Sequence, residues 1–354
     1  MAPSPTTLNY AANAPTYRPW LHRFAILLAV CTLGLIVAGA MVTSTGSGLA
    51  VPDWPTTYGQ NMFTFPPSKW VGGIFYEHVH RLIASTIGFL TIILAVWLHR
   101  CEPRRWLRKL GWIALGLVIV QGILGGLTVR FFLPTPISVM HGCTAQAFFC
   151  ITIAIAVFTS RSWIMSPPPV ESAARPALTT CSIILTGVVL TQLVLGAVMR
   201  HTESGLAILD FPLANGRIMP DISDTALTQY NETRRMGHFL PEVTAAQVMY
   251  HMAHRYWAVV VAIVLLATMR LAIVRHGDIR SIRMLAWAGI GLLCVQIALG
   301  AWTVWSGKHP YIATAHVAVG AATLGTAWLL TLQAHRRLQV ASSRDHPALE
   351  GAVA

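Results

Sequence analysis

Residues 45–59 read TGSGLAVPDWPTTYG, and residues 202–216 read TESGLAILDFPLANG, so one short pattern occurs twice in the 354-residue chain. The repetition continues further along, because VQGILGGLTV at 120–129 matches VQIALGAWTV at 295–304. Self-similarity at a constant spacing indicates an internal duplication. The fold should therefore consist of one unit built twice.

The composition is that of an integral membrane protein. Hydrophobic residues make up 55% of the chain and charged residues only 11%, whereas a soluble domain averages about 25% charged residues. The net charge of +12 would suit nucleic acid on a soluble surface, but its placement along this chain indicates membrane topology instead. We expect the lipid bilayer as a partner and no nucleic acid.

Apolar runs long enough to cross about 30 Å of hydrocarbon predict eight transmembrane helices, four in each half. They cover residues 24–43, 81–99, 110–129, 139–159, 177–199, 254–274, 284–305 and 313–334. The first run has no following cleavage pattern, so we expect a retained helix that also acts as the insertion signal.

Arginine and lysine are concentrated at one set of helix ends. They gather in the N-terminal segment, in the connections after the second, fourth and sixth helices, and in the tail. By the positive-inside rule both termini of this multi-pass protein are expected to be cytoplasmic. The repeated motif at 45–59 and 202–216 then lies in outer loops.

Four spans is an even number, so both halves have the same orientation. We predict an all-α membrane protein of two tandem four-helix bundles, related by a pseudo-two-fold axis along the membrane normal. The predicted parts are a cytoplasmic segment 1–23, an N-terminal bundle 24–165, a cytoplasmic linker 166–176, a C-terminal bundle 177–335 and a cytoplasmic tail 336–354.

The repeated loop motif S-G-L-A-x-x-D-[WF]-P favours an architectural role. Gly and Pro suit tight turns, and the aromatic residue suits the membrane interface. Asp53 and Asp210 either cap backbone amides or pair with a nearby arginine. Of the six cysteines, five lie in apolar runs and Cys101 lies in a short basic connection, a distribution that predicts no disulfide and no cysteine metal site.

Four of the fourteen histidines occupy repeated positions at the outer ends of helices. They are His80, His141, His254 and His316, the second- and fourth-helix histidines of each half. A single such histidine would suit hydrogen-bonded packing, but two imidazoles facing each other across a bundle suit axial ligation of a haem iron. Zinc is disfavoured, because it takes four ligands, usually with cysteine or carboxylate among them.

Small residues and arginines accompany these histidines. Arg81 and Arg255 follow His80 and His254 directly and either pair with haem propionates or extend to lipid headgroups. Small side chains would let the helices accommodate a macrocycle; they include Gly122, Gly125, Gly126, Ala298 and Gly300.

The two halves differ at one ionisable position. Glu77 lies three residues before His80, on the same helical face, whereas the second half has His251 there. A carboxylate in one half only suggests one reactive pocket and one pocket that carries electrons, although a solvated helix end would also accept a glutamate. His78 points away from the face of His80 and ranks below it as a ligand.

The combination of VTSTGSGLAVPDWP, Glu77 with His80-Arg81, His141, His254-Arg255 and His316 resembles the haem A synthase family. The resemblance covers about residues 20–335 and implies oxidation of a ring methyl of haem O to a formyl group, giving haem A for terminal oxidases. It implies haem O as substrate between His80 and His141, haem b as cofactor between His254 and His316, and Glu77 as the catalytic acid. Haem O synthase and oxidase assembly factors are the protein partners implied, the bacterial cytoplasmic (inner) membrane is the location implied, and a homo-oligomer is left open.

The chain departs from part of that family in its outer loops. Some bacterial members carry a cysteine pair there, the first near the position of Val51, and this chain has none. A mechanism that needs those cysteines does not apply. Two other readings compete with the enzyme: a non-catalytic di-haem cytochrome b, which predicts symmetric sites, and a haem or metal transporter, which predicts polar residues at mid-membrane.

Overall fold

A computed structural model of the chain describes residues 16–172 and 176–340. The described part is almost entirely helical, and eight of its helices are long and apolar enough to cross a membrane, which confirms the predicted number. Parts of the predicted N-terminal segment 1–23, linker 166–176 and tail 336–354 lie outside the described residues.

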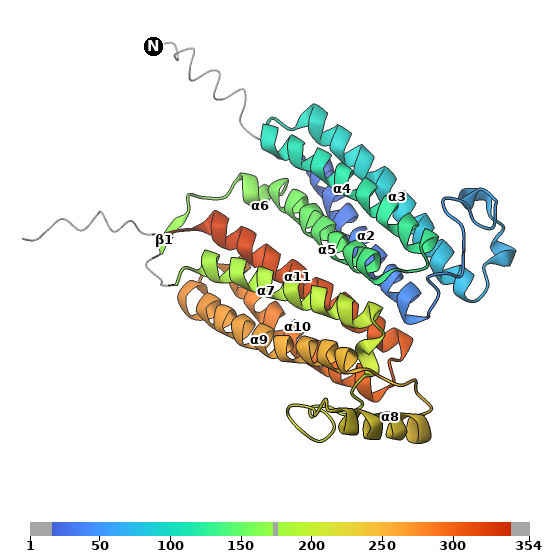
Figure 1. The fold of residues 1–354 in the computed structure, drawn as a ribbon. Helices are drawn as coiled ribbons and strands as arrows, with labels where there is room; N and C mark the ends of the chain where they lie inside the picture. Colours follow the sequence, from blue (N-terminus) through green and yellow to red (C-terminus); the bar gives the residue numbers. More distant parts are fainter. Residues whose placement is uncertain (1–15, 173–175, 341–354) are drawn as a thin grey trace, which may run out of the picture.

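The first four long helices form one bundle, drawn in blue to green in Figure 1. They are α2 (Pro19–Ser44), α3 (Gly73–Cys101), α4 (Arg105–Arg130) and α5 (Thr135–Phe158). Each helix contacts the next, and α5 contacts α2, so α3 and α5 stand diagonally opposite. Their inner apolar faces bury a core that includes Leu28, Leu94 and Ile155.

The last four long helices form a second bundle with the same order of contacts. They are α7 (Leu178–His201), α9 (Ala245–His276), α10 (Arg280–Trp305) and α11 (Pro310–Arg337). Here α9 and α11 are diagonal, around a core that includes Leu185, Leu265 and Leu324. The bundles lie side by side through α11 with α2, α5 with α7, and α5 with α11. Exchanging the two halves leaves this set of contacts unchanged, although the two-fold axis itself stays a prediction.

Short elements complete the described chain. They are η1 (Met62–Thr64), η2 (Pro67–Lys69), α6 (Arg161–Ile164), β1 (Val170–Ser172), η3 (Ser204–Leu206), α8 (Asp224–His238) and β2 (Leu338–Val340). Strands β1 and β2 pair in parallel, which joins the predicted linker to the predicted tail. Residues 45–72 and α8 lie at the opposite end of the molecule from β1 (Figure 1).

Several helices extend beyond the apolar runs. Helix α3 begins at Gly73 and α9 at Ala245, about two turns before the runs at 81–99 and 254–274. The capping box of Thr244 with Gln247 stabilises the early start of α9. These extra turns carry Glu77 and His251, so both residues lie on regular helix.

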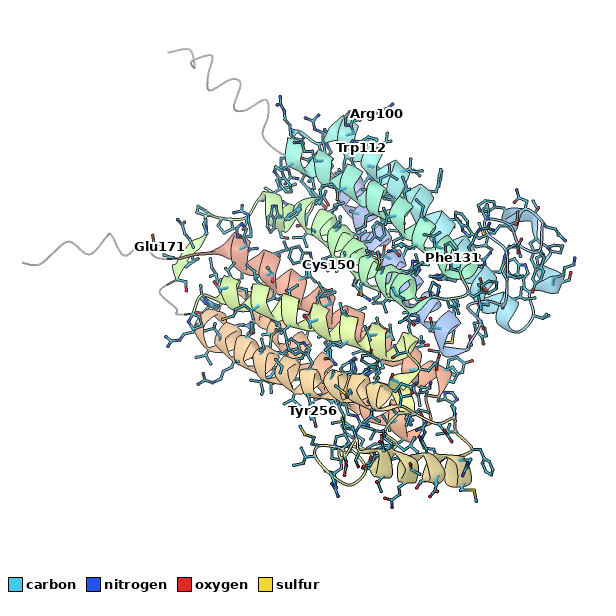
Figure 2. All side chains as sticks on the ribbon, viewed as in Figure 1. Arg100, Trp112, Phe131, Cys150, Glu171 and Tyr256 are labelled. Atoms are coloured by element: carbon cyan, nitrogen blue, oxygen red, sulfur yellow. The ribbon has the colours of Figure 1, made fainter. Side chains whose placement is uncertain are left out.

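The outer sides of the bundles are apolar, as lipid contact requires. Exposed side chains there include Ile26, Val30, Ile123 and Ile263. Figure 2 shows Arg100 and Trp112 at one end of the first bundle and Phe131 at the other. The surface therefore agrees with a multi-pass membrane protein.

Candidate haem-binding sites

The four predicted histidines lie on diagonal helices. His80 is on α3 and His141 on α5, and His254 is on α9 and His316 on α11. All four are half-buried. Each bundle thus has one pair of imidazoles on helices that face each other across its interior.

The second pair has the spacing of two ligands to one ion. The ring centroids of His254 and His316 are 6.4 Å apart, with the planes at 70°. Metal–imidazole bonds are about 2 Å long, so two nitrogens on opposite sides of one ion stand about 4 Å apart, with the ring centres further out. The pair fits a haem iron held between two imidazoles.

A glycine of the neighbouring helix lies against each imidazole. A methyl carbon placed on the glycine would lie 2.9–3.2 Å from the ring carbon Cε1. The pairs are Gly39 with His80, Gly125 with His141, Gly196 with His254, and Gly300 with His316. Each ring therefore occupies space that any larger residue would fill.

Ring nitrogens in these pockets are short of partners within the described chain. The Nδ1 atoms of His80, His141 and His316 are buried without a hydrogen bond. A buried polar atom without a partner is costly and typical of a site built for a ligand. Among residues 16–172 and 176–340, no three histidine, cysteine or acidic side chains cluster as a metal-ion site, so the donor set is two pairs of imidazoles.

Glutamines distinguish the two pockets. In the second bundle, the Gln192 side chain donates to the carbonyl of His254 at 3.1 Å and lies 3.1 and 3.2 Å from its ring nitrogens, and that of Gln296 lies 3.3 Å from Nε2 of His316. In the first bundle, Gln121 instead donates to the carbonyl of His141 and to the Thr144 hydroxyl. The residue equivalent to Gln192 there is Leu35, so the second pocket is the more polar.

Glu77 is buried and bound to the first outer loop. Its exposed fraction is 3%, Oε2 accepts from the Val51 amide at 2.8 Å, and Oε1 accepts from the Arg81 guanidinium at 2.5 Å. Glu77 is therefore not a solvated residue at a helix end. The carboxylate lies one helical turn from His80.

Arg81 and Arg255 fasten the loop motifs. Arg81 donates to the carbonyls of Val51, Asp53 and Thr56 as well as to Glu77, so four of its five N–H groups bind protein. Only Nε–H is left for a propionate.

Arg255 makes equivalent contacts, donating to the carbonyls of Asp210 and Leu213 and to Nε2 of His251. Pairing of either arginine with propionates stays a prediction.

The aspartates of the two motifs cap turns, one of the two roles that the sequence allowed. Asp53 accepts from the amides of Tyr58 and Gly59 and from the Thr56 hydroxyl, and Asp210 accepts from two amides in the same way. Partial burial raises the pKa of Asp53, but these hydrogen bonds outweigh it, and the pKa is lowered overall. The motif is architectural, as predicted.

His78 faces the outer loop. It is fully buried, its Nδ1 lies 3.2 Å from the Thr57 hydroxyl, and its ring packs against Phe65 and Trp70. This packing agrees with its low rank as a ligand.

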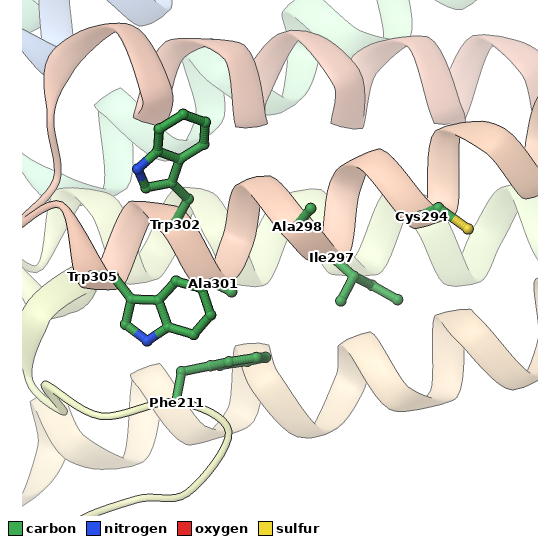
Figure 3. A pocket seen from close by; sticks show the side chains of 7 residues that line it. All are labelled: Phe211, Cys294, Ile297, Ala298, Ala301, Trp302 and Trp305. Atoms are coloured by element: carbon green, nitrogen blue, oxygen red, sulfur yellow. The ribbon is translucent and has the colours of Figure 1, made fainter.

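The loop aromatics pack on α4 and α10. A methyl on Gly126 would overlap the Trp54 indole. In the second half, the equivalent residues Phe211 and Ala301 line a 610 Å³ apolar pocket with Trp302 and Trp305 (Figure 3). Its lining has no histidine and includes Ala298, one of the small residues named above.

Sequence reasoning named Gly125 and Gly300 only as space for a macrocycle and missed Gly39 and Gly196. The repeat could have identified both, because residues 39 and 196 have the same 157-residue separation as the loop motif. The contact between Glu77 and Val51 had no sequence signal.

Known proteins resemble the chain over most of its length. The family model described as "Cytochrome oxidase assembly protein" matches residues 22–328. Heme A synthase of Shouchella clausii is 31% identical over 58% of this chain and 68% of its own length. Heme A synthases of Geobacillus kaustophilus and Novosphingobium aromaticivorans are 25% and 26% identical over 94% and 95% of this chain, and over 98% and 99% of their own lengths.

Proposed function

Because the chain belongs to the haem A synthase family, we propose that it oxidises a ring methyl of haem O to the formyl group of haem A. The family makes it a membrane enzyme of haem A biosynthesis with a haem substrate. The reaction class and the roles of individual residues are the proposal.

The cofactor site is assigned to the second bundle. His254 and His316 hold haem b, and the observation that carries this assignment is their 6.4 Å ring separation on diagonal helices. When bound, haem b supplies one-electron transfer. The side-chain amides of Gln192 and Gln296 lie 3.1–3.3 Å from ring nitrogens of the two histidines and so restrict the orientation of the imidazoles.

The substrate site is assigned to the first bundle. His80 and His141 flank haem O, and the glycine contacts of both rings support the assignment because they repeat those of the second bundle. Conversion of CH₃ to CHO consumes one water and releases four protons and four electrons. The first pocket therefore needs a group that handles protons, and the second carries electrons away.

Glu77 is the proposed proton-handling group. It is the carboxyl group one turn from His80, and Arg81 and the Val51 amide fix its two oxygens. A carboxylate so held can exchange a proton at Oε1 or Oε2 and can stabilise positive charge developing nearby.

The topology follows from the basic residues. Both termini lie in the cytoplasm of a bacterial cell with the protein in the inner membrane, and the haem pockets lie toward the outer face. Haem O synthase and oxidase assembly factors are the proposed protein partners. The proposal is also compatible with a homo-oligomer.

A di-haem cytochrome b is the second candidate, favoured by the matching contacts of Glu77 and His251, each of which lies against a loop amide and against the arginine four residues further along. It predicts that neither pocket converts haem O. The transporter is third, because the mid-membrane polar groups it needs are here few beyond glutamines and hydroxyls.

The test is product formation. The full chain is expressed in a host that makes haem O, and the extracted pigments are analysed by mass. Haem A that forms with the wild-type chain and is lost with Glu77→Gln supports the proposal. Wild-type protein that binds haem O without forming haem A would favour the cytochrome.

A further inference from the structure

We propose that Gly39, Gly125, Gly196 and Gly300 are positioning residues that set where the four haem-ligating imidazoles stand. The inference rests on the proposed function, because it concerns the same histidines. It adds a requirement on the neighbouring helices: each ligand needs a residue without a side chain opposite it.

The contact has the same form at all four places. The ring atom nearest the missing methyl is always Cε1, at 2.9 Å for Gly39, 3.1 Å for Gly196, and 3.2 Å for Gly125 and Gly300. Cε1 lies between the two ring nitrogens. A side chain would push on this edge and displace both nitrogens together.

The arrangement is duplicated with the histidines. In each bundle, the first helix contacts the histidine of the second, and the third contacts the histidine of the fourth. Residues 39 and 196 are 157 positions apart, and residues 125 and 300 are 175 apart, which are the separations of the two repeated motifs. The glycine and its imidazole therefore behave as one repeated unit.

Other glycines of the same helices lack this contact. A methyl placed on four of them would meet nothing within 4 Å, and these are Gly34 on α2, Gly116 on α4, Gly187 on α7 and Gly291 on α10. Other glycines of these helices, such as Gly126 against Trp54, pack closely on side chains other than the imidazoles and do not serve as controls. The four glycines in open space are matched controls, one per helix.

The displacement is large on the scale of metal ligation. A contact below 3.4 Å forces the neighbour to move by a few tenths of an ångström, whereas ligand distances in metal sites hold within about 0.2 Å. Alanine should therefore weaken the iron–imidazole bond even where the helix remains intact, and alanine is itself the better helix former.

The test compares Gly196→Ala and Gly300→Ala with Gly187→Ala and Gly291→Ala in the full-length chain purified with its haem. We measure haem per protein, the low-spin absorption bands and the midpoint potential. The contact variants should bind haem about 10-fold or more weakly, the lower end of the effect of outer-shell groups, or show a shifted potential and high-spin bands. The controls should match wild type.

The first bundle supplies a second, graded test. Titrated with added haem, Gly39→Ala should lose more affinity than Gly125→Ala, because its contact is shorter, and Gly34→Ala and Gly116→Ala should retain affinity. Should Gly39→Ala fail to fold, the comparison of Gly125→Ala with Gly116→Ala still decides the question.

One result would contradict the role of the glycines, and a different result would contradict the assignment of the histidine ligands. Contact variants that equal their controls while His254→Ala loses its haem would refute the glycine role and leave the haem site standing. Retention of an unchanged haem spectrum in His254→Ala would instead refute the ligand assignment on which the inference rests.

Discussion

Glu77 and His251 make the same two contacts in the two halves of the chain. Glu77 accepts from the Val51 amide at 2.8 Å and from Arg81 at 2.5 Å. The two ring nitrogens of His251 lie 3.3 Å from the Ile208 amide nitrogen and 3.0 Å from Nε of Arg255, and a neutral imidazole accepts at one of them. Position alone therefore does not distinguish them. What Glu77 adds is a carboxyl group that carries negative charge when it has lost its proton, which an imidazole does not supply.

Replacing Glu77 by histidine separates these contributions. Glu77→His reproduces the second half, so the loop and haem binding should persist while haem A formation falls about 10²–10⁴-fold, the usual contribution of a positioned acid or base. Products are measured by mass analysis and bound haem by absorption. Haem A formation at the wild-type rate would make Glu77 purely architectural.

Glu77→Ala should be the more damaging change. It leaves the Arg81 guanidinium, whose side chain is only 10% exposed, without its carboxylate, and breaking a buried ion pair costs about 3–5 kcal/mol. Thermal unfolding in detergent should show Glu77→Ala well below both wild type and Glu77→His. If Glu77→Ala were as stable as wild type, the ion pair would not be a loop anchor.

Arg81→Lys tests the fastening of the first outer loop. Lysine has three donors and no planar fork, so it cannot bind the carbonyls of Val51, Asp53 and Thr56 together with Glu77. Faster proteolysis within residues 45–72 is expected, while Arg130→Lys, a change at an exposed residue at the end of α4, serves as the control. If Arg81→Lys resisted proteolysis as well as wild type does, a single contact from residue 81 would be enough to hold the loop.

Gln192→Leu gives the second pocket the residue that the first has at Leu35. The variant loses hydrogen bonds worth about 1 kcal/mol each, and about 1.4 kcal/mol corresponds to 59 mV for one electron. A redox titration should therefore show the second haem shifted by tens of millivolts with its content retained. An unchanged midpoint potential would show that Gln192 does not tune the potential of the second haem.

Acid should loosen the turn around Asp53. Its pKa is lowered in the fold, so the stabilisation is present above its ordinary pKa of about 3.9 and is lost as pH falls through the lower folded value. Amide exchange at Tyr58 and Gly59, corrected for the intrinsic rate, should accelerate in that range. Asp53→Asn should abolish this pH dependence, and a dependence that persists would assign it to another group.

The sequence predicted the helices well because lipid imposes a strong and local requirement. In lipid, about twenty consecutive apolar residues must be helical to satisfy their backbone groups, so hydropathy predicts the number of transmembrane helices. The duplication then predicts that the histidines lie on the second and fourth helices of each bundle. Helix α8 had no such signal, because its sequence is polar and its docking depends on buried Arg234, which donates to the carbonyls of Leu206 and Pro241.

Contacts between distant segments were beyond sequence reasoning. Arg81 was expected at propionates or headgroups, and the fold brings the loop carbonyls to it across 25–30 residues. Likewise, the sequence suggested that Glu77 either takes part in the chemistry or is solvated at a helix end. The structure shows instead that both Glu77 and His251 contact the outer loop of their own half. A single residue can hold a loop and carry a reaction, and only variants such as Glu77→His separate the two.

The ligand assignment of the second bundle gives the last prediction. His254→Ala and His316→Ala should each lose the low-spin spectrum of a b-type haem, because one remaining imidazole cannot fill both axial positions. His309→Ala is the control, since His309 lies at the start of α11 and pairs with Tyr311 rather than with the site. Wild-type helicity by circular dichroism would show that the loss is local. If either His254→Ala or His316→Ala kept an unchanged low-spin spectrum, the iron must take a different ligand, and the 6.4 Å pair would be a packing contact.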